Sequence, residues 1–364
     1  GSTLFANNGN PLNVTNSGTL SVQSGSVDVN VTTFDNSGSV AVGGAGTFNL
    51  NATGTNSGSY NLAVGGNANL TGGTQTFNTG SAITGGGSFV INGGTLTDAG
   101  AMNASNLTLA SGTLNGSGAL TVNNGFTWSG GTQSGSGSTT VANTATFALD
   151  TTNTPQLNGR SFTNSGTGTW SGGNYISIGN GGSFSNAGTL TATGNAAAYN
   201  NLGGTGSFVN SGTFTKTTGT GSTLFANNGN PLNVTNSGTL SVQSGSVDIN
   251  VTTFDNSGSV AVGATGTFNL NANGTNTGSY NLAAGGIANL TGGTQTFNAG
   301  TAITGGGRFV INGGTFTDAA AINASNITLA TGGTLNGAGT LNITNDFTWS
   351  GGTQSGSGST TVAN

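Results

Sequence analysis

Apolar and polar residues alternate along most of the chain. The stretches 20–22, 40–42 and 60–62 each carry an apolar side chain at every second position, and a second alternating run follows a glycine-containing break, as at 48–50. A period of two is typical of β-strands, and no stretch has a helical period of useful length. We therefore expect two or three short strands in each repeat, separated by Asn and Gly turns.

A short motif marks each repeat. The triplet Asn-Ser-Gly, followed by Ser or Thr, begins at Asn16, Asn36 and Asn56 and comes directly before an alternating run. It recurs at Asn164, Asn210, Asn236 and Asn256, with variants at Asn78, Asn186 and Asn276. The basic period is about 20–22 residues, which is long enough for one coil of a β-helix and too short for a propeller blade.

A second, longer repeat contains the short one. Residues 1–143 recur almost unchanged as residues 221–364. We expect a first long unit at 1–220 and a second, incomplete copy at 221–364, in one continuous solenoid.

Differences between the two copies indicate which positions face the core. Four apolar positions keep their character between the copies and are predicted to be buried: Val29 and Ile249, Met102 and Ile322, Leu107 and Ile327, Val122 and Ile343. A charge buried without a partner is costly, so Arg308 in place of Ser88, and Asp346 in place of Gly125, are expected to face water. The one inserted residue, at Gly332-Gly333, should lie in a turn, because in a strand it would reverse every following side chain.

These patterns predict an all-β fold, a right-handed parallel β-helix of roughly seventeen or eighteen coils. Equivalent residues of successive coils would then lie about 4.8 Å apart. The first apolar residue after each triplet (Leu20, Val40, Tyr60) should form an inward ladder.

The triplets themselves predict a second ladder, on the outside or at a corner of the coils. Stacked Asn side chains can hydrogen-bond along the stack, and we expect the Gly to supply a positive φ at the turn. The predicted corner residues are Asn16, Gly18, Asn36, Gly38, Asn56, Gly58, Asn236, Gly238, Asn256 and Gly258. We take this structural role for the triplet in preference to a ligand or glycan motif.

Composition narrows the alternatives. With 71 Gly and only 32% hydrophobic residues, a compact globule is not expected. Disordered chains are usually rich in Pro, Lys and Glu, whereas this chain has three Pro, a single Lys and no Glu. The regular apolar period also opposes disorder.

Charge and residue chemistry exclude several functions. The net charge is −5 and Lys216, Arg160 and Arg308 are the basic residues, so we expect no nucleic-acid binding and no adhesion to an anionic lipid surface. No apolar run approaches the length of a membrane span, so we expect no membrane insertion. The absence of Cys and His removes thiolate chemistry and the usual zinc sites.

An enzyme is one alternative, because β-helices can act on polysaccharides. The Asp residues are scattered along the chain, and we expect them to be solvated turn residues: Asp28, Asp35, Asp98, Asp150, Asp248, Asp255, Asp318 and Asp346. Asp28 and Asp35 are close enough to approach one another but have no basic neighbour in sequence. The calcium-binding pattern Gly-Gly-x-Gly-x-Asp is missing, since Ser88 and Phe89 follow Gly85-Gly86-Gly87. We expect no catalytic site, metal or cofactor.

Aromatic and threonine patterns raise two further alternatives. Trp128, Trp170 and Trp349 could stack on sugars if exposed, but Trp128 shares its face with Phe126, which indicates the core. Thr-x-Thr segments at 189–193 and 213–217 are typical of ice-binding solenoids. We expect no repetition of this array at the same place in successive coils, and so no ice-matching plane.

The pattern Asn-Ser-Gly-Thr-Leu-x-Val, at 16–22 and 236–242, and Gly-Gly-Thr-Leu at 93–96 resemble the coils of filamentous-haemagglutinin-like and autotransporter passenger proteins. The resemblance covers essentially the whole chain. It implies export from a bacterium and an extracellular role as adhesin or biofilm fibre. We expect a structural shaft that continues end to end into a filament by self-association or by further coils, with host or surface glycans as possible ligands.

Overall fold

The computed structural model describes residues 1–363, which form an all-β parallel solenoid of about 17 turns with almost no helix. The fold class predicted from the sequence is confirmed, and right-handed winding stays a prediction. The described residues contain one short 3-10 helix, η1 (Thr151–Asn153). No helix within residues 1–363 is both long enough and apolar enough to cross a membrane.

The chain divides into two compact units, Gly1–Gly168 and Thr169–Asn364, and the division falls inside strand β19 (Thr167–Ser171). The strands of the first unit are β1 (Ser2–Ala6), β2 (Asn13–Asn16), β3 (Thr19–Asn36), β4 (Ser39–Asn56), β5 (Ser59–Leu62), β6 (Asn67–Gly72), β7 (Thr74–Phe77), β8 (Ala82–Gly85), β9 (Ser88–Ile91), β10 (Thr95–Asp98), β11 (Met102–Leu109), β12 (Thr113–Gly116), β13 (Ala119–Trp128), β14 (Thr132–Ser134), β15 (Ser138–Val141), β16 (Thr146–Asp150), β17 (Gln156–Asn158) and β18 (Ser161–Asn164). Those of the second unit are β20 (Tyr175–Gly179), β21 (Ser183–Asn186), β22 (Thr189–Ala192), β23 (Ala197–Asn200), β24 (Gly206–Asn210), β25 (Thr213–Lys216), β26 (Ser222–Asn227), β27 (Leu232–Asn236), β28 (Thr239–Asn250), β29 (Thr253–Asn256), β30 (Ser259–Asn271), β31 (Gly274–Asn276), β32 (Ser279–Leu282), β33 (Ile287–Gly292), β34 (Thr294–Phe297), β35 (Ala302–Thr304), β36 (Arg308–Ile311), β37 (Thr315–Asp318), β38 (Ile322–Leu329), β39 (Thr334–Gly337), β40 (Thr340–Trp349), β41 (Thr353–Gln354) and β42 (Ser359–Val362).

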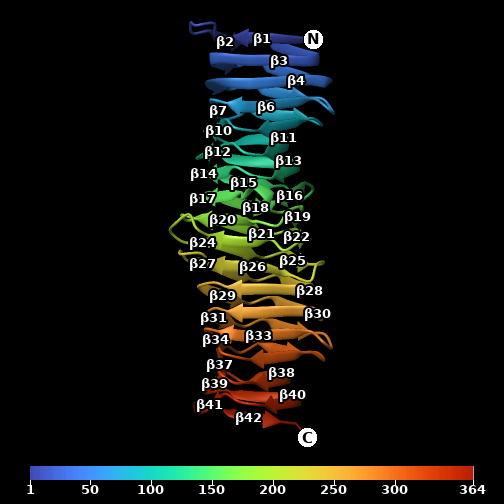
Figure 1. Cartoon of the computed structure of the whole chain (residues 1–364), viewed down its shortest axis with the longest axis vertical. Coiled ribbons are helices and arrows are strands. Elements are labelled where there is room, and N and C mark those ends of the chain that lie inside the picture. The colour runs from blue at the N-terminus through green and yellow to red at the C-terminus, as the bar shows by residue number, and fades with distance from the viewer. Residues whose placement is uncertain (364) are drawn as a thin grey trace. The chain divides into compact units, whose positions relative to one another are not determined.

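Each coil of the first unit carries three strand directions. Strands β5, β6 and β7 make one coil, and each pairs in parallel with its counterpart β8, β9 or β10 in the next. Tyr60 lies opposite Ile83 and Leu70 opposite Ile91, so apolar positions repeat from coil to coil. Figure 1 shows the same stacking for β3 and β4, which continue around the corners as single strands.

The second unit repeats this arrangement. Strands β32, β33 and β34 pair in parallel with β35, β36 and β37. Coil length varies more than the sequence suggested. Hydrogen-bonded side chains of neighbouring coils are 18 residues apart at Asn106 and Asn124 but 26 apart at Asn210 and Asn236. Turns absorb the difference, because the register of the paired strands has to place apolar residues inside.

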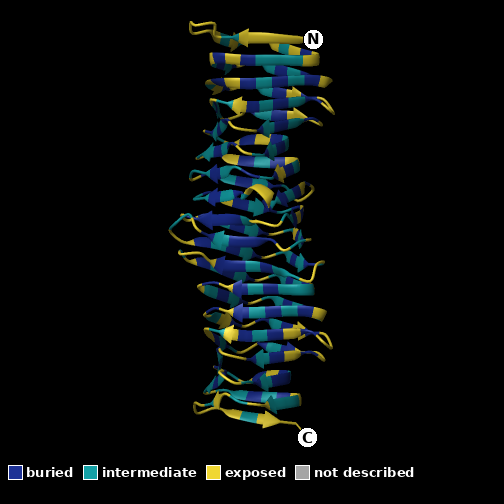
Figure 2. Cartoon of the chain, in the orientation of Figure 1, coloured by how far each residue is buried: buried dark blue, intermediate teal, exposed yellow. Residues whose placement is uncertain are grey.

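The core consists of the inward side chains of successive strands. Buried and exposed positions alternate along the strands of both units (Figure 2), and Leu20, Val40 and Tyr60 lie in one register as predicted. All four pairs of apolar positions that vary conservatively between the copies are buried, which confirms them as core positions. Aromatic rings of neighbouring coils contact one another, for example Tyr60 and Phe89, whose centroids are 5.1 Å apart.

The water-facing positions and the insertion also agree with the sequence analysis. The side chains of Arg308 and Asp346 are 53% and 47% exposed. The inserted glycine lies between β38 and β39, where Gly332 has a φ of 89°. A positive φ is readily adopted by Gly, so the extra residue enlarges a turn and leaves the strands in register.

Candidate functional site

The predicted corner residues of the first unit meet in one column. The Asn16 Nδ2 donates to the Asn36 Oδ1 at 2.8 Å, and the Asn36 Nδ2 donates to the Asn56 Oδ1 at 2.6 Å. The same amide of Asn16 also donates to the backbone carbonyl of Ser39, at 2.9 Å. The ladder thus joins successive coils both through side chains and through the main chain.

The second unit contains a longer ladder of the same kind. Asn186, Asn210 and Asn236 each donate to the next Asn of the column at 2.8 Å, and Asn256 is the last acceptor. Asn276 lies in register with Asn256 and donates to the Oε1 of Gln295 at 2.6 Å. The polar column therefore continues across coils of different length.

The ladder is buried, which rules out the outward position and leaves the corner position of the two alternatives expected. Asn36 is 1% exposed and Asn56 is fully buried, as is Asn236. A buried amide needs partners for its donors and acceptor, and the neighbouring coils provide them for Asn36 and Asn236. The sequence could not distinguish an inward polar column from an outward one, because Asn is usually a surface residue.

The role predicted for the triplet glycines is wrong in its detail. Gly18, Gly38, Gly58, Gly238 and Gly258 are not among the glycines with positive φ. Instead the coils approach so closely that a Cβ on Gly38 would overlap the carbonyl oxygen of Gly18, and a Cβ on Gly58 would overlap that of Gly38. Glycine is required here by contact between coils.

One predicted variant of the triplet lies outside the ladder. The residue in register with Asn56 is Phe77, so the neighbouring Asn78 is displaced by one position. The next coil places Asp98 opposite Phe77, in the same column. The buried ring of Phe77 thus interrupts the polar column, which has a carboxylate in the following coil.

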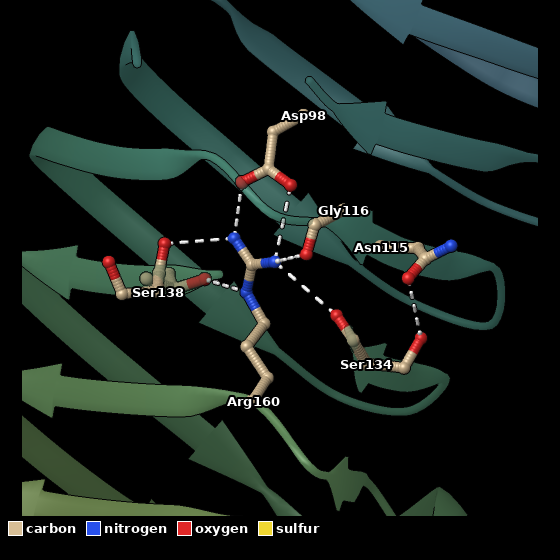
Figure 3. Close-up of polar contacts among 7 residues, drawn as sticks. Asp98, Asn115, Gly116, Ser134, Ser138 and Arg160 are labelled. Carbon is tan, nitrogen blue, oxygen red and sulfur yellow. Dashed lines mark hydrogen bonds and ion pairs between the residues drawn. The ribbon is translucent and has the colours of Figure 1, made fainter. Parts of the chain in front are cut away.

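Asp98 forms an ion pair with Arg160 in the interior of the first unit (Figure 3). Both side chains are fully buried, although the residues are 62 positions apart. The Arg160 Nη1 donates to the Asp98 Oδ1 at 3.2 Å, and the Nη2 donates to the Oδ2. This contact is bidentate, the geometry in which Arg binds a carboxylate most strongly.

Neighbouring coils satisfy the rest of the guanidinium. The Nε donates to the Thr139 Oγ1 at 3.0 Å, and the Nη2 donates to the Ser138 carbonyl at 2.8 Å. The Nη1 is also 3.3 Å from the carbonyl oxygen of Ser134. Glycines give the long side chain its space, since a Cβ on Gly137 would lie only 2.9 Å from the Nη1.

Burial and the Arg160 guanidinium have opposite effects on the pKa of Asp98. Burial raises the pKa of the Asp98 carboxyl above its usual value, while the hydrogen bonds and charge of Arg160 lower it. The expectation that this Asp is a solvated turn residue is wrong. It is wrong for Asp318 too, which is its counterpart in the second copy and is 5% exposed.

Four other Asp residues accept hydrogen bonds from an adjacent coil. Asp28 accepts from Asn49 at 2.6 Å, and Asn49 accepts from Asn69 at 2.7 Å. Asp35 accepts from both the backbone N–H and the hydroxyl of Thr55, each at 2.8 Å. The second copy makes the same bonds from Asp248 and Asp255.

A second ion pair joins two positions that change together between the copies. The Arg308 Nη2 lies 3.4 Å from the Asp346 Oδ2 on an exposed face. The first copy has Ser88 and Gly125 there, within an open groove of about 410 Å³ that also includes Asn67, Asn106 and Thr127. The larger charged side chains of the second copy occupy the equivalent position.

The buried lysine has no acidic partner among the described residues. Lys216 is buried, and its Nζ donates to the carbonyl of Gly194 and, at 3.4 Å, to the Asn195 Oδ1. Burial lowers the pKa of the Lys216 ammonium. Only one of the three Lys and Arg residues, Arg308, is therefore exposed.

The remaining candidates for ligand chemistry have mixed outcomes. Trp128 and Trp170 are buried as expected, but Trp349 is 57% exposed. The Thr array does recur in register, contrary to expectation. Thr189 pairs with Thr213, and Thr191 pairs with Thr215. The array ends within a few coils, since Ser259 and Ala261 occupy the same positions two coils later.

Neither a metal centre nor a known relative gives a further indication of function. Within residues 1–363 no group of three or more Asp, Glu, His or Cys side chains is placed to hold a metal ion. No protein-family description, curated protein or solved structure matches the chain.

Proposed function

We propose that this chain is a structural shaft segment of a secreted bacterial surface fibre or adhesin. The observation that carries the proposal is the use of interior polar side chains to join one coil to the next. In a solenoid each repeat contacts only its neighbours, so bonds along the stack determine how well the whole array resists unfolding. A long shaft requires this property.

The charged residues support a mechanical role. Asp28 and Asp35 accept hydrogen bonds from Asn49 and Thr55 of the next coil, and the two copies of the sequence repeat these contacts. Carboxylates used in this way are not free to act as a general acid and base, which would need a paired partner across a cleft.

The likeness to filamentous-haemagglutinin-like and autotransporter passenger coils supports an extracellular location and a role in adhesion or biofilm. Side chains on the exposed faces are mainly Ser, Thr and Asn, which suits contact with water and with glycan hydroxyls. We propose end-to-end self-association or continuation into further coils as the principal interaction. Binding of host or surface glycans would be secondary.

Electron microscopy of the native full-length material tests the proposal. We expect fibres a few nanometres wide with an axial spacing of about 4.8 Å between coils and a repeat of roughly 50 Å for each long unit. Compact, monodisperse particles of the native protein would show that it is not a shaft.

A polysaccharide-active enzyme is the main competing function. It predicts hydrolysis or lyase activity on an acidic polysaccharide that is lost in Asp28→Asn or Asp35→Asn. We expect no such activity in the unaltered chain, and a change in thermal stability as the effect of either substitution, because both carboxylates bond to neighbouring coils.

A further inference from the structure

A small cavity lies in the last coils of the second unit. Its volume is about 160 Å³, and it is open enough for a small molecule to enter. It is lined by Asp318, Leu335, Gln354, Ser355, Gly356, Gly358, Ser359 and Thr360. Asp318 is its single charged residue.

The same set of residues surrounds the guanidinium of Arg160 in the first unit. Each lining residue is identical to its counterpart in the first copy, in order Asp98, Leu114, Gln133, Ser134, Gly135, Gly137, Ser138 and Thr139. Four of these counterparts, Asp98, Ser134, Ser138 and Thr139, accept hydrogen bonds from Arg160. The first unit therefore shows what this set of groups binds.

The acceptors in the cavity lack a donor of this kind. Asp318 is 5% exposed and is in neither of the two ion pairs of the described residues. Burial raises the pKa of its carboxyl, and the stabilising contact that opposes this is a hydrogen bond with its own backbone. Thr360, the counterpart of the hydroxyl that accepts from the Arg160 Nε, instead donates to Gln354 at 3.2 Å.

Shape also favours a planar cation. In the first unit, Gly116 and Gly137 have no side chains and so leave room for the guanidinium. Gly337 and Gly358 are their counterparts in the second unit. In the first unit the acceptors surround the forked end of the Arg160 side chain. An arginine guanidinium has five N–H donors in one plane to fill such a set of acceptors, whereas an ammonium group has three.

We infer that the cavity at Asp318 is a guanidinium-binding site, which takes the side chain of an arginine carried by a coil packed against β41 and β42. The guanidinium forms a bidentate contact with Asp318, and its other N–H groups donate to the carbonyls of Ser355 and Ser359 and to the hydroxyl of Thr360. The arginine occupant rests on the proposed continuation into further coils, whereas binding of a free guanidinium depends on the lining residues alone.

Binding of a small guanidinium compound to the chain itself is the first test. Selective ¹³C labelling of aspartate gives eight carboxyl signals, because the chain contains eight Asp and no Glu, and Asp318→Asn identifies the relevant one. We expect ethylguanidinium to shift the Asp318 signal saturably and to lower its apparent pKa, with an affinity about tenfold above that of propylammonium. Asp346→Asn, which removes an exposed carboxylate, should leave this response unchanged.

An extended chain tests the arginine side chain directly. Residues 144–168, appended after Asn364, the counterpart of Asn143, add a copy of the coil that carries Arg160. We expect Asp318→Asn to speed hydrogen exchange in residues 315–360 at least tenfold in this extended chain. The effect should be under twofold when the appended Arg is replaced by Gln. Equal effects in the two chains, or an Asp318 signal in the first test that responds equally to both cations or to neither, would overturn the inference.

Discussion

Replacement of Arg160 by Met should destabilise the first unit strongly and locally. Methionine keeps an unbranched side chain of similar reach but removes every donor, so Asp98 is left buried without its cation. Carbonyls of Ser134 and Ser138 lose a donor as well. Removal of one partner from a buried ion pair costs about 3–5 kcal/mol, mainly because the other charge remains buried.

Hydrogen exchange is a suitable assay, because repeat arrays do not always unfold in a single step and exchange reports each region separately. A loss of about 3–5 kcal/mol corresponds to exchange at least about 100-fold faster in residues 95–165, at about tenfold for every 1.4 kcal/mol. Residues 253–318 serve as the internal reference. Arg308→Ser is the matched control, because its ion pair with Asp346 is about half exposed and should contribute about 1 kcal/mol or less.

The effect of Arg160→Met should also depend on pH. Burial raises the pKa of Asp98, and loss of Arg160 removes the contacts that lower it. Between the pKa of the unfolded chain, about 3.9, and the higher folded value, the native variant binds more protons than the unfolded chain. Its stability therefore falls as pH rises through that window.

The penalty should thus be largest near pH 7 and smaller near pH 4, after correction for intrinsic exchange rates. Asp98→Asn combined with Arg160→Met should recover part of the loss near pH 7. A single variant that behaves like Arg308→Ser at both pH values would refute the reasoning, since Asp98 would then not depend on its partner.

Three further substitutions test individual contacts. Gly38→Ala should cost about 1–3 kcal/mol in thermal unfolding, because the new Cβ would overlap the Gly18 carbonyl of the preceding coil. Gly18→Ala should be nearly neutral, because a Cβ there has nothing within 4 Å. Equal losses of stability would contradict close approach as the cause. Asn36→Ala should cost about 1–3 kcal/mol, because it removes the acceptor of one Asn16 hydrogen bond and the donor to the buried Asn56 Oδ1. Unchanged stability in urea would argue against the ladder. Tyr280→Phe should cost about 1 kcal/mol, because the Tyr280 hydroxyl donates to Asn276 at 2.6 Å. Tyr60→Phe should be neutral or stabilising, because the buried Tyr60 hydroxyl has no partner in residues 1–363. The reverse order of melting temperatures would refute this assignment.

The alternation and the repeats determine the fold class by themselves. A period of two in short runs, separated by Asn and Gly and repeated about every 20 residues, predicts strands that stack in parallel. Each coil then buries its apolar side chains against those of the next coil. Conservative exchanges such as Val29 to Ile249 identify core positions, because only volume and polarity have to be maintained there. The stacking of Asn16, Asn36 and Asn56 follows from the same repeat, because the three residues are 20 positions apart.

Contacts along the stack were decided by the tertiary structure. Asp98 and Arg160 are 62 residues apart and separated by coils of unequal length, so no local pattern brings them together, and the register that does is set by apolar packing. The same stacking places the Asn column inside and makes Gly38 necessary through its distance from Gly18. A periodic sequence thus determines which residues form strands, whereas apolar packing sets the register in which the strands stack, and turns of different length absorb the extra residues. This stacking decides which polar side chains of neighbouring coils meet.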